Sequence, residues 1–325
     1  MAPVTAVPSA AATRVAGRLP ASGVVAVREL VAAATAADGV APLSEHVSLH
    51  LRYGGQGPDA NVLRHDGDGV LVGYAHVDPT DAVAGSRAEL VVHPDHRGRG
   101  HGRALVEAAL AIPPDGRLRL WAHGDRPAAR ALAVSMGFRE QRRLEQWERP
   151  LDTPLPAVEL PDGVTLRGFR PGTDDAAWLE LNARAFADHP EQGSWTANDL
   201  AARIAEDWFD PAGFLLAQDR DGALVAFHWT KVHGGEGSHG HDPIGEVYVV
   251  GVHPDAQGRG LGRAVTLAGL HRLRDAGLGA AMLYVEGDNT AARATYRRLG
   301  FTHRDTDVMF LRQPGDGDRP GRPTR

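Results

Sequence analysis

EVYVVGVHPDAQGRGLGRAV, residues 246–265, is the stretch that decides how this chain folds. Its first seven residues are mostly apolar, and β-branched or aromatic types among them predict a buried strand. Glycines at 258, 260 and 262 follow, and the pattern after them predicts a helix over 260–276. The first N–H groups of a helix that begins in a glycine-rich turn are exposed, so the turn suits an anion such as a pyrophosphate. Arg259 and Arg263 can add positive charge.

A second copy of this turn lies 160 residues earlier in the chain. HPDHRGRGHGRA (93–104) matches HPDAQGRGLGRA (253–264), and GDRPAARALAVSMGF (124–138) matches GDNTAARATYRRLGF (287–301) at an offset of 163. A solenoid would show many short periods, whereas two matched blocks at nearly one offset indicate a duplicated domain.

Strand and helix patterns alternate in both halves and predict two α/β domains. In the second half we expect strands over 164–170, 214–218, 223–231, 246–252, 281–285 and 301–311, and helices over 174–187, 196–209, 260–276 and 290–299. Thr196 is expected to cap the second of these helices. The first half shows the same order with weaker signals, starting with a helix over 25–37. The predicted organisation is a disordered extension (1–20), a first domain (21–147), a proline-rich linker (148–163), a second domain (164–312) and a disordered tail (313–325).

Composition narrows the classes of function. The chain has 325 residues, a net charge of −6 and no cysteine. The missing cysteines exclude disulfides, thiolate metal sites and a cysteine nucleophile. An acidic balance argues against a nucleic-acid partner, and no apolar run is long enough to cross a membrane. The absence of cysteine fits a cytoplasmic protein, and we expect a monomer.

A glycine-rich loop by itself also occurs in dinucleotide-binding folds and in plain tight turns. The His-Pro turn, the Gln257–Gly262 loop and the GDNTAA–Tyr–LGF block together resemble the GNAT acetyltransferases. The resemblance implies two tandem GNAT domains, each with a mixed, mostly antiparallel central sheet flanked by helices, and acetyl-CoA as the cosubstrate.

The resemblance narrows to the mycothiol synthase family of tandem GNAT enzymes. It rests on ADGVAPLSEHV (37–47), AFADHPEQGSW (185–195), the 246–263 stretch and MLYVEGDNTAARATYRRLGF (282–301). What it implies is transfer of acetyl from acetyl-CoA to the cysteinyl amine of desacetylmycothiol. Another acceptor amine (an aminoglycoside, a polyamine or a protein N-terminus) remains an alternative, and so does a non-catalytic acetyl-CoA-binding protein.

The resemblance assigns roles to individual residues. Glu246 is expected to be the general base, acting through water, and Tyr296 to protonate the departing CoA thiolate. The alternatives are a surface carboxylate at a strand end and a half-buried helical aromatic. The acceptor is expected to contact Glu45, Glu191, Lys231, Glu246 and Tyr284.

Two loops and one helix start are expected to bind acetyl-CoA. In the second domain these residues are Val250, Gly251, Val252, Gln257, Gly258, Arg259, Gly260, Leu261, Gly262, Arg263, Asn289, Thr290, Ala291, Ala292, Arg293 and Ala294. In the first they are Leu90, Val91, Val92, Arg97, Gly98, Arg99, Gly100, His101 and Gly102. The alternative role of Asn289 is that of an N-cap.

A metal is not expected. His228, His233, His239 and His241 suggest one, but their segment is glycine-rich and offers no helical pairing of ligands, so a loop over the cleft is the preferred interpretation.

The first domain is expected to bind acetyl-CoA without catalysing. At an offset of 160, Glu246 aligns with Ser86, and at 163, Tyr296 and Asn289 align with Ala133 and Arg126. Glu89 lies three residues beyond Ser86, and side chains alternate along a strand, so it should point to the opposite face.

Overall fold

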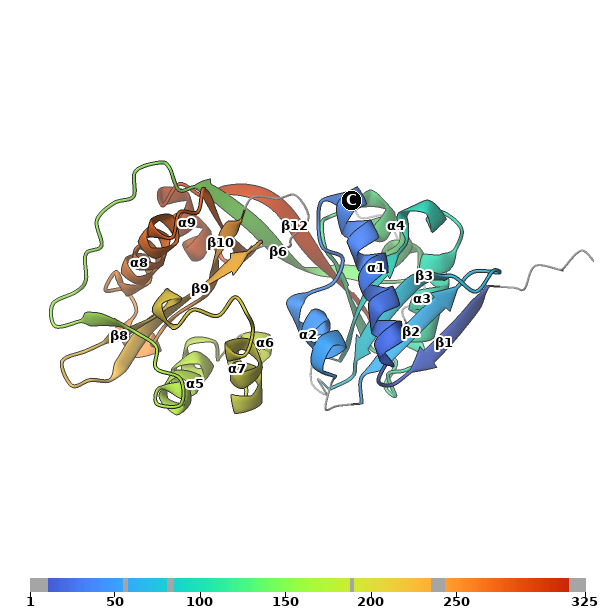
Figure 1. Cartoon of the computed structure of the whole chain (residues 1–325), viewed down its shortest axis with the longest axis horizontal. Helices are drawn as coiled ribbons and strands as arrows, with labels where there is room; N and C mark the ends of the chain where they lie inside the picture. Colours follow the sequence, from blue (N-terminus) through green and yellow to red (C-terminus); the bar gives the residue numbers. More distant parts are fainter. Residues whose placement is uncertain (1–10, 55–57, 81–84, 188–189, 235–242, 316–325) are drawn as a thin grey trace, which may run out of the picture. The chain divides into compact units, whose positions relative to one another are not determined.

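A computed structural model describes residues 11–54, 58–80, 85–187, 190–234 and 243–315. The chain forms two compact units, one of Met1–Leu144 and Asp305–Arg325 and the other of Glu145–Arg304. Each unit has a central sheet with helices on both faces (Figure 1). Most strand pairs are antiparallel, so the α/β architecture predicted from the sequence is confirmed.

The sheet of the first unit has the strand order β1-β2-β3-β4-β5-β12. Its neighbours run antiparallel except β4 and β5, which run parallel. The strands are β1 (Ala12–Ala16), β2 (Ala60–His65), β3 (Leu71–Asp78), β4 (Ser86–Val92), β5 (Leu118–Ala122) and the later part of β12 (Thr302–Arg312).

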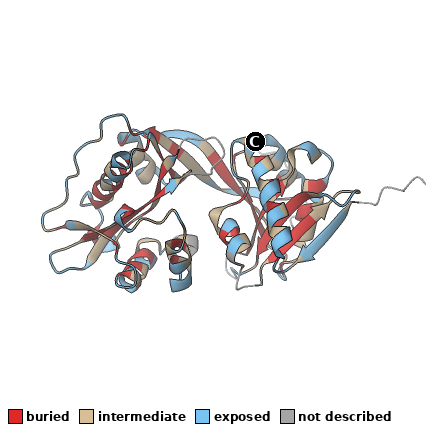
Figure 2. Ribbon diagram, viewed as in Figure 1, coloured by how far each residue is buried: buried red, intermediate tan, exposed pale blue. Residues whose placement is uncertain are grey.

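Alternation of side chains gives this sheet two apolar faces. Its middle strands are largely buried (Figure 2). Val62 and Ala75 belong to the core that includes α3 and α4, whereas Leu63 and Tyr74 belong to the core that includes α1 and α2. The helices are α1 (Ala21–Asp38), α2 (Glu45–Tyr53), α3 (His101–Leu110) and α4 (Pro127–Ser135).

The sheet of the second unit has the order β6-β11-β10-β9-β8-β7. The pair β10–β11 is parallel, like its counterpart β4–β5, and the pairs from β7 to β10 are antiparallel. The strands are the later part of β6 (Arg139–Pro150), β7 (Thr165–Gly168), β8 (Phe214–Gln218), β9 (Leu224–His233), β10 (Ile244–Val252) and β11 (Ala280–Glu286).

Helices cover both faces of this sheet as well. On one face Trp178 of α5, 0% exposed, packs against Phe214, Phe227 and Trp229 of the sheet. On the other face Val265 and Leu270 of α8 belong to two further cores. The helices are α5 (Asp175–Ala185), α6 (Pro190–Gly193), α7 (Ala197–Ile204), α8 (Leu261–Asp275) and α9 (Thr290–Arg298). Thr196 caps α7 as predicted.

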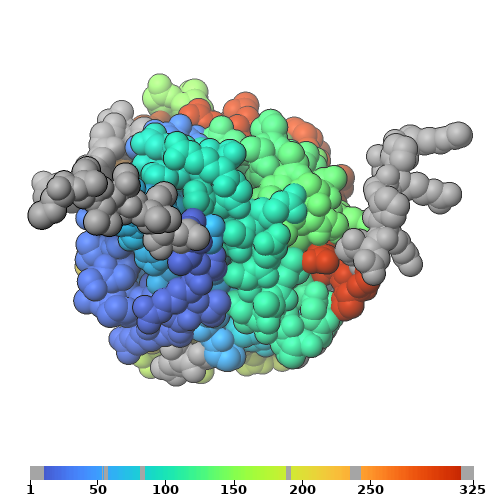
Figure 3. Space-filling model, turned by 90° about the vertical axis from the view of Figure 1, so that its right-hand side faces the viewer, coloured from blue at the N-terminus to red at the C-terminus, as the bar shows by residue number. Residues whose placement is uncertain are grey.

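The last strand of the chain completes the sheet of the first unit. The sequence predicted that residues 164–312 would form one domain, but Asp305–Arg312 belong with the first 144 residues. The reason is an antiparallel ladder from Val308–Ala122 to Arg312–Leu118, which gives β5 its second neighbour. In Figure 3 residues from the end of the chain (red) lie on the surface among green and teal residues of the first unit.

The expected extension over residues 1–20 is partly ordered. Residues 12–16 form β1 because they pair antiparallel with 61–65 of β2, and α1 begins at Ala21. Residues 1–10 of the extension and 316–325 of the tail lie outside the described residues.

A buried polar network ties β4, β5 and β12 together in the first unit. His123 Nδ1 lies 2.9 Å from Asp307 Oδ2, and its Nε2 lies 3.3 Å from Glu89 Oε2. Ser44 donates its hydroxyl and its backbone N–H to the Glu89 carboxylate. Burial alone would lower the pKa of His123, but the bonds to Asp307 and Glu89 outweigh it and raise the pKa to about 10. The His123 side chain is therefore an imidazolium between two carboxylates.

We predict that His123→Gln destabilises the first unit by about 3–5 kcal/mol near pH 6, because it leaves two buried carboxylates without a countercharge. The pKa of His123 is higher in the folded state than in the unfolded state. Its contribution is therefore complete below about pH 6.5 and lost as the pH rises toward 10. Guanidinium unfolding curves at pH 6 and pH 10 measure both effects.

The control is His303→Gln, at an exposed histidine of β12, the strand that also contains Asp307. It should change the free energy of unfolding by less than about 0.5 kcal/mol. Equal stability of His123→Gln and wild type at pH 6 would show that the network contributes nothing.

Candidate active site

The two glycine-rich turns have the same backbone conformation. Gly98 and Gly100 have φ angles of 72° and 82°, and Gly258 and Gly260 have 75° and 82°. α3 and α8 begin directly after the second glycine of each pair, which is a left-handed N-cap without a side-chain capping bond. The first-turn N–H groups of both helices are thus not used by a capping side chain, and each turn can hold a pyrophosphate.

One backbone edge of β10 is open beside its turn. The parallel ladder between β10 and β11 runs from Gly245–Ala281 to Val247–Leu283 and, within the described residues, stops there, although both strands continue. N–H and C=O groups on such an edge can bond an extended chain of amides, as an added strand does. The predicted pantetheine-binding residues Val250, Gly251 and Val252 lie on this stretch.

A β-bulge at Tyr248 marks the point where the strands separate. The register of β10 with β9 shifts between Val247 and Val249, so Tyr248 is an extra residue. Bulges turn a strand and change the direction of its side chains, and they are common next to active sites. The bulge lies two residues after Glu246.

Glu246 is a buried carboxylate with an imidazole bound to it. Its residue is 6% exposed, and Glu246 Oε2 lies 2.6 Å from His233 Nε2. Lys231 is its register partner in β9 and is also buried; its Nζ lies 4.5 Å from the Trp208 ring centroid. A carboxylate in this setting is not a solvated strand-end charge. Its predicted catalytic role stays a prediction, now with a positioning partner in His233.

Tyr296 lies on α9, half-buried, and its ring contacts Phe301 with centroids 5.8 Å apart. Burial raises the pKa of Tyr296 to about 12. The phenol therefore keeps its proton at neutral pH, which is the state that a proton donor requires.

Asn289 is the N-cap of α9, because its Oδ1 accepts a hydrogen bond from Ala292 N at 3.0 Å. The capping alternative is thus correct. A contact of Asn289 with CoA stays a prediction, and it would use the side-chain amide nitrogen. Thr290 to Ala294 form the first turns of the helix, as predicted.

The register corrects the alignment of Glu246 with Ser86. In the parallel ladders Glu246 pairs with Met282 and Arg87 pairs with Arg119, and Met282 and Arg119 are 163 residues apart, the offset of the downstream block. The bulge at Tyr248 has no counterpart in the continuous β3–β4 register, which accounts for the difference of one residue. Arg87 therefore stands where the second unit has Glu246.

Charges at this position are reversed between the units. Glu246 has Lys231 as its cross-strand partner, whereas Arg87 has Asp78, with Nη2 3.3 Å from Oδ2. Glu89 is not a free carboxylate near this position, because it bonds His123 and Ser44 in the buried network. At the position of Tyr296, α4 has the buried Ala133.

Side-chain hydrogen bonds hold the glycine-rich turn of the first unit to neighbouring elements. Arg97 makes two hydrogen bonds to the Asp38 carboxylate, at 2.8 and 2.7 Å, which lower the pKa of Asp38. Arg97 thus joins the loop to the end of α1 rather than adding charge for a phosphate. Arg64 Nε donates to the buried His101 Nδ1 at 3.4 Å. The open edge recurs, since the β4–β5 ladder of the described residues ends at Glu89–Trp121 before Leu90 to Val92.

The predicted acceptor residues belong to different elements. Tyr284, 41% exposed, lies in β11 two residues after the register partner of Glu246. Glu191 lies in α6, and its side chain is outside the described part. Glu45 opens α2 in the first unit. Their contacts with an acceptor stay predictions.

Sequence reasoning missed an aromatic wall beside Glu246. Trp208 and Trp229 both contact the Tyr248 ring, with centroids 5.3 and 5.5 Å apart. Arg203 donates to the Tyr248 hydroxyl at 2.8 Å and lies over Trp195. From the sequence, His233 suggests only a metal ligand. Its position at the end of β9, next to the antiparallel strand β10, is the signal that it could bond a side chain of β10 such as Glu246. His228 is buried and bonds Val265 O, while His239 and His241 lie outside the described residues.

Among the described residues, no helix is both long and apolar enough to cross a membrane.

Comparison with known proteins covers both units. Residues 176–301 match the acetyltransferase (GNAT) family, and residues 58–140 match an acetyltransferase (GNAT) domain. A mycothiol acetyltransferase of Acidothermus cellulolyticus is 57% identical over 306 residues, covering 91% of this chain and 93% of the relative. One from Thermobispora bispora is 58% identical over 288 residues, covering 88% and 95%.

A solved structure supports the fold. A tandem GNAT protein from the clavulanic acid biosynthesis pathway superposes with a TM-score of 0.72 at 20% identity, over 94% of this chain and 99% of that one. With the duplicated glycine turns and the open edge of β10, these likenesses confirm the predicted family: the chain belongs to the mycothiol acetyltransferases, which are tandem GNAT acetyltransferases.

Proposed function

We propose that this chain transfers the acetyl group of acetyl-CoA to the cysteinyl amine of desacetylmycothiol, with Glu246 as the general base and Tyr296 as the general acid. The observation that carries this proposal is the buried Glu246 carboxylate, which His233 orients beside the open edge of β10. The names of the relatives support the acceptor.

The reaction needs a neutral amine, a polarised thioester and a protonated leaving group. An α-amino group has a pKa of about 7.7–8, so a carboxylate that takes its proton through water is sufficient. The amine nitrogen attacks the thioester carbon and the carbon–sulfur bond breaks. Glu246 receives the amine proton. His233 holds the carboxylate through Oε2.

Tyr296 completes the proton balance. The departing CoA sulfur takes the phenolic proton, which the raised pKa of Tyr296 keeps in place until the thiolate forms. The phenolate is then reprotonated from solvent. Because both groups sit in one unit of the duplicated chain, a single catalytic centre is sufficient.

The wall beside Glu246 suits the sugar part of the acceptor. Rings such as Trp208 and Tyr248 offer flat apolar faces, and the ammonium of Lys231 lies against both. Sugar rings combine apolar C–H faces with hydroxyl groups, so a wall of rings with a cation among them fits a glucosaminyl-inositol better than a flexible aliphatic polyamine.

The first unit binds acetyl-CoA without catalysing in this proposal. Its turn repeats the conformation of the catalytic turn at Gly98 and Gly100, and its strand edge is open at the same place. Its base position holds Arg87, which cannot accept a proton at neutral pH.

We predict that Glu246→Gln and Tyr296→Phe each lower kcat by about 10- to 1000-fold, because each removes one proton-transfer group. Stopped-assay chromatography of released CoA measures the rate. Glu180→Gln, at a carboxylate 67% exposed, and Tyr74→Phe, at a buried tyrosine of the first unit, serve as controls and should retain wild-type kcat. Wild-type kcat/KM in both catalytic variants would refute these two roles.

The acceptor is tested by competition. We predict that a cysteinyl-glucosaminyl-inositol is acetylated on nitrogen at least about 100-fold faster, by kcat/KM, than an aminoglycoside, a polyamine or a peptide N-terminus, as expected when a site hydrogen-bonds its own substrate. Mass spectrometry identifies the acetylated atom. Glucosaminyl-inositol without cysteine is the control and should not react. Preference for a protein N-terminus would overturn the assignment of the acceptor but not the family.

A further inference from the structure

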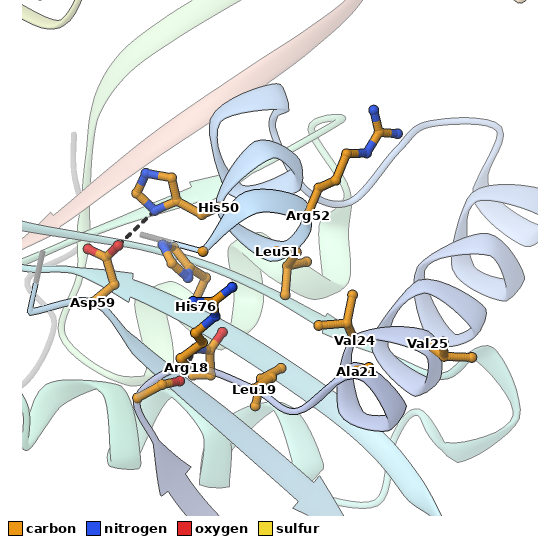
Figure 4. Close-up of a pocket in the computed structure, with 13 residues that line it drawn as sticks. Arg18, Leu19, Ala21, Val24, Val25, His50, Leu51, Arg52, Asp59 and His76 are labelled. Carbon is orange, nitrogen blue, oxygen red and sulfur yellow. Dashed lines mark hydrogen bonds and ion pairs between the residues drawn. The ribbon is translucent and has the colours of Figure 1, made fainter. Parts of the chain in front are cut away.

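Three potential metal ligands meet in the first unit, away from the elements of its glycine turn. A nitrogen of His50, a carboxylate oxygen of Asp59 and a nitrogen of His76 all lie within 4.8 Å of one another. They come from α2, from the segment before β2 and from β3. Figure 4 shows the three side chains converging at one end of a pocket.

Polar atoms of this cluster are buried without hydrogen bonds. His76 is 3% exposed, and within the described residues neither of its ring nitrogens has a hydrogen-bond partner. Asp59 Oδ1 is likewise unsatisfied, while Oδ2 lies 2.7 Å from His50 Nδ1. A buried polar group without a partner costs about 1–3 kcal/mol, so several in one place indicate that a ligand is bound there.

The donors are of the kinds that bind a metal cation. A neutral imidazole has a ring-nitrogen lone pair to donate, and a carboxylate has oxygen lone pairs. Two imidazoles and one carboxylate are ligands that zinc prefers. Ligand atoms of a tetrahedral zinc site are about 3.3–3.5 Å apart for bonds of about 2.0–2.1 Å, so modest side-chain rotations would close the set.

The surroundings supply an outer shell and an open position. His46 packs its ring on His50, with centroids 4.1 Å apart, and its Nε2 lies 3.4 Å from Asp78 Oδ2. The adjoining pocket has a volume of about 570 Å³ and includes Arg18, Asn61 and Leu51 in its lining. Three protein ligands beside a cavity are typical of a site whose fourth ligand is water.

We propose that His50, Asp59 and His76 bind one Zn²⁺ ion whose fourth ligand is a water molecule facing this pocket. None of the three ligands is a residue that we assign to acetyl transfer. It revises the expectation that the chain holds no metal.

The test uses the untagged full-length chain, stripped with a chelator, then given Zn²⁺ or Co²⁺. We expect one zinc per chain after desalting, visible absorption bands with Co²⁺ from tetrahedral coordination, and a melting temperature that rises with Zn²⁺. His76→Gln and the near-isosteric Asp59→Asn should each weaken zinc binding by more than about 100-fold, because loss of an outer-shell partner alone costs 10–100-fold.

The matched control is His65→Gln, a histidine of neighbouring β2 outside the cluster, which should bind zinc as wild type does. Circular dichroism shows whether each variant folds. If His76→Gln does not fold, the zinc affinity of Asp59→Asn provides the test. Unchanged zinc stoichiometry and affinity in folded Asp59→Asn would place the metal elsewhere and overturn the proposal. Failure of the wild type to retain zinc, or preference for Mg²⁺, would also overturn it.

Discussion

The hydrogen bonding of one strand, β10, is the constraint on which the candidate active site depends. One edge pairs with β9 along nearly its full length, whereas the other pairs with β11 for three residues and then stops in the described structure. The bulge at Tyr248 lies at this point. Beyond this point the edge of β10 that faces β11 has backbone groups open for an extended amide chain, beside the buried carboxylate of Glu246.

Burial of that carboxylate has a cost that its neighbours offset. An ionised group out of water needs hydrogen bonds or countercharges, and His233 supplies a bond of 2.6 Å while Lys231 lies across the ladder. In the first unit the same position is held by an Arg87–Asp78 pair of reversed charge. The fold of the duplicate is thus kept, while the charge pair at this position is reversed.

Much of this arrangement could be predicted from the sequence, because it is local. The turns at 98–102 and 258–262, the helix after each and the cap at Thr196 follow from glycine spacing and capping residues. The internal repeat showed that the glycine-rich turn occurs twice in the chain. Glu246 and Tyr296 came from resemblance, and the structure adds their burial and partners.

What could not be predicted depends on contacts between distant residues. A bulge of one residue moved the equivalent of Glu246 from Ser86 to Arg87, and no local pattern marks it. The pairing of β12 with β5 joins residues nearly 190 positions apart. His50, Asp59 and His76 show no motif, because three separate elements bring them together. Helix α2 was missed as well, although Ser44 caps it.

We infer that one chain carries two acetyl-CoA sites and one proton-transfer centre. A calorimetric titration of the Glu246→Gln/Tyr296→Phe double variant with acetyl-CoA, followed by a turnover assay on the same sample, tests both parts of this inference. We expect two acetyl-CoA molecules bound per chain and almost no release of CoA when acceptor is added. Substantial acetyl transfer by the double variant, abolished by blocking the turn at 98–102, would show that the first unit is an active enzyme and that the inference is wrong.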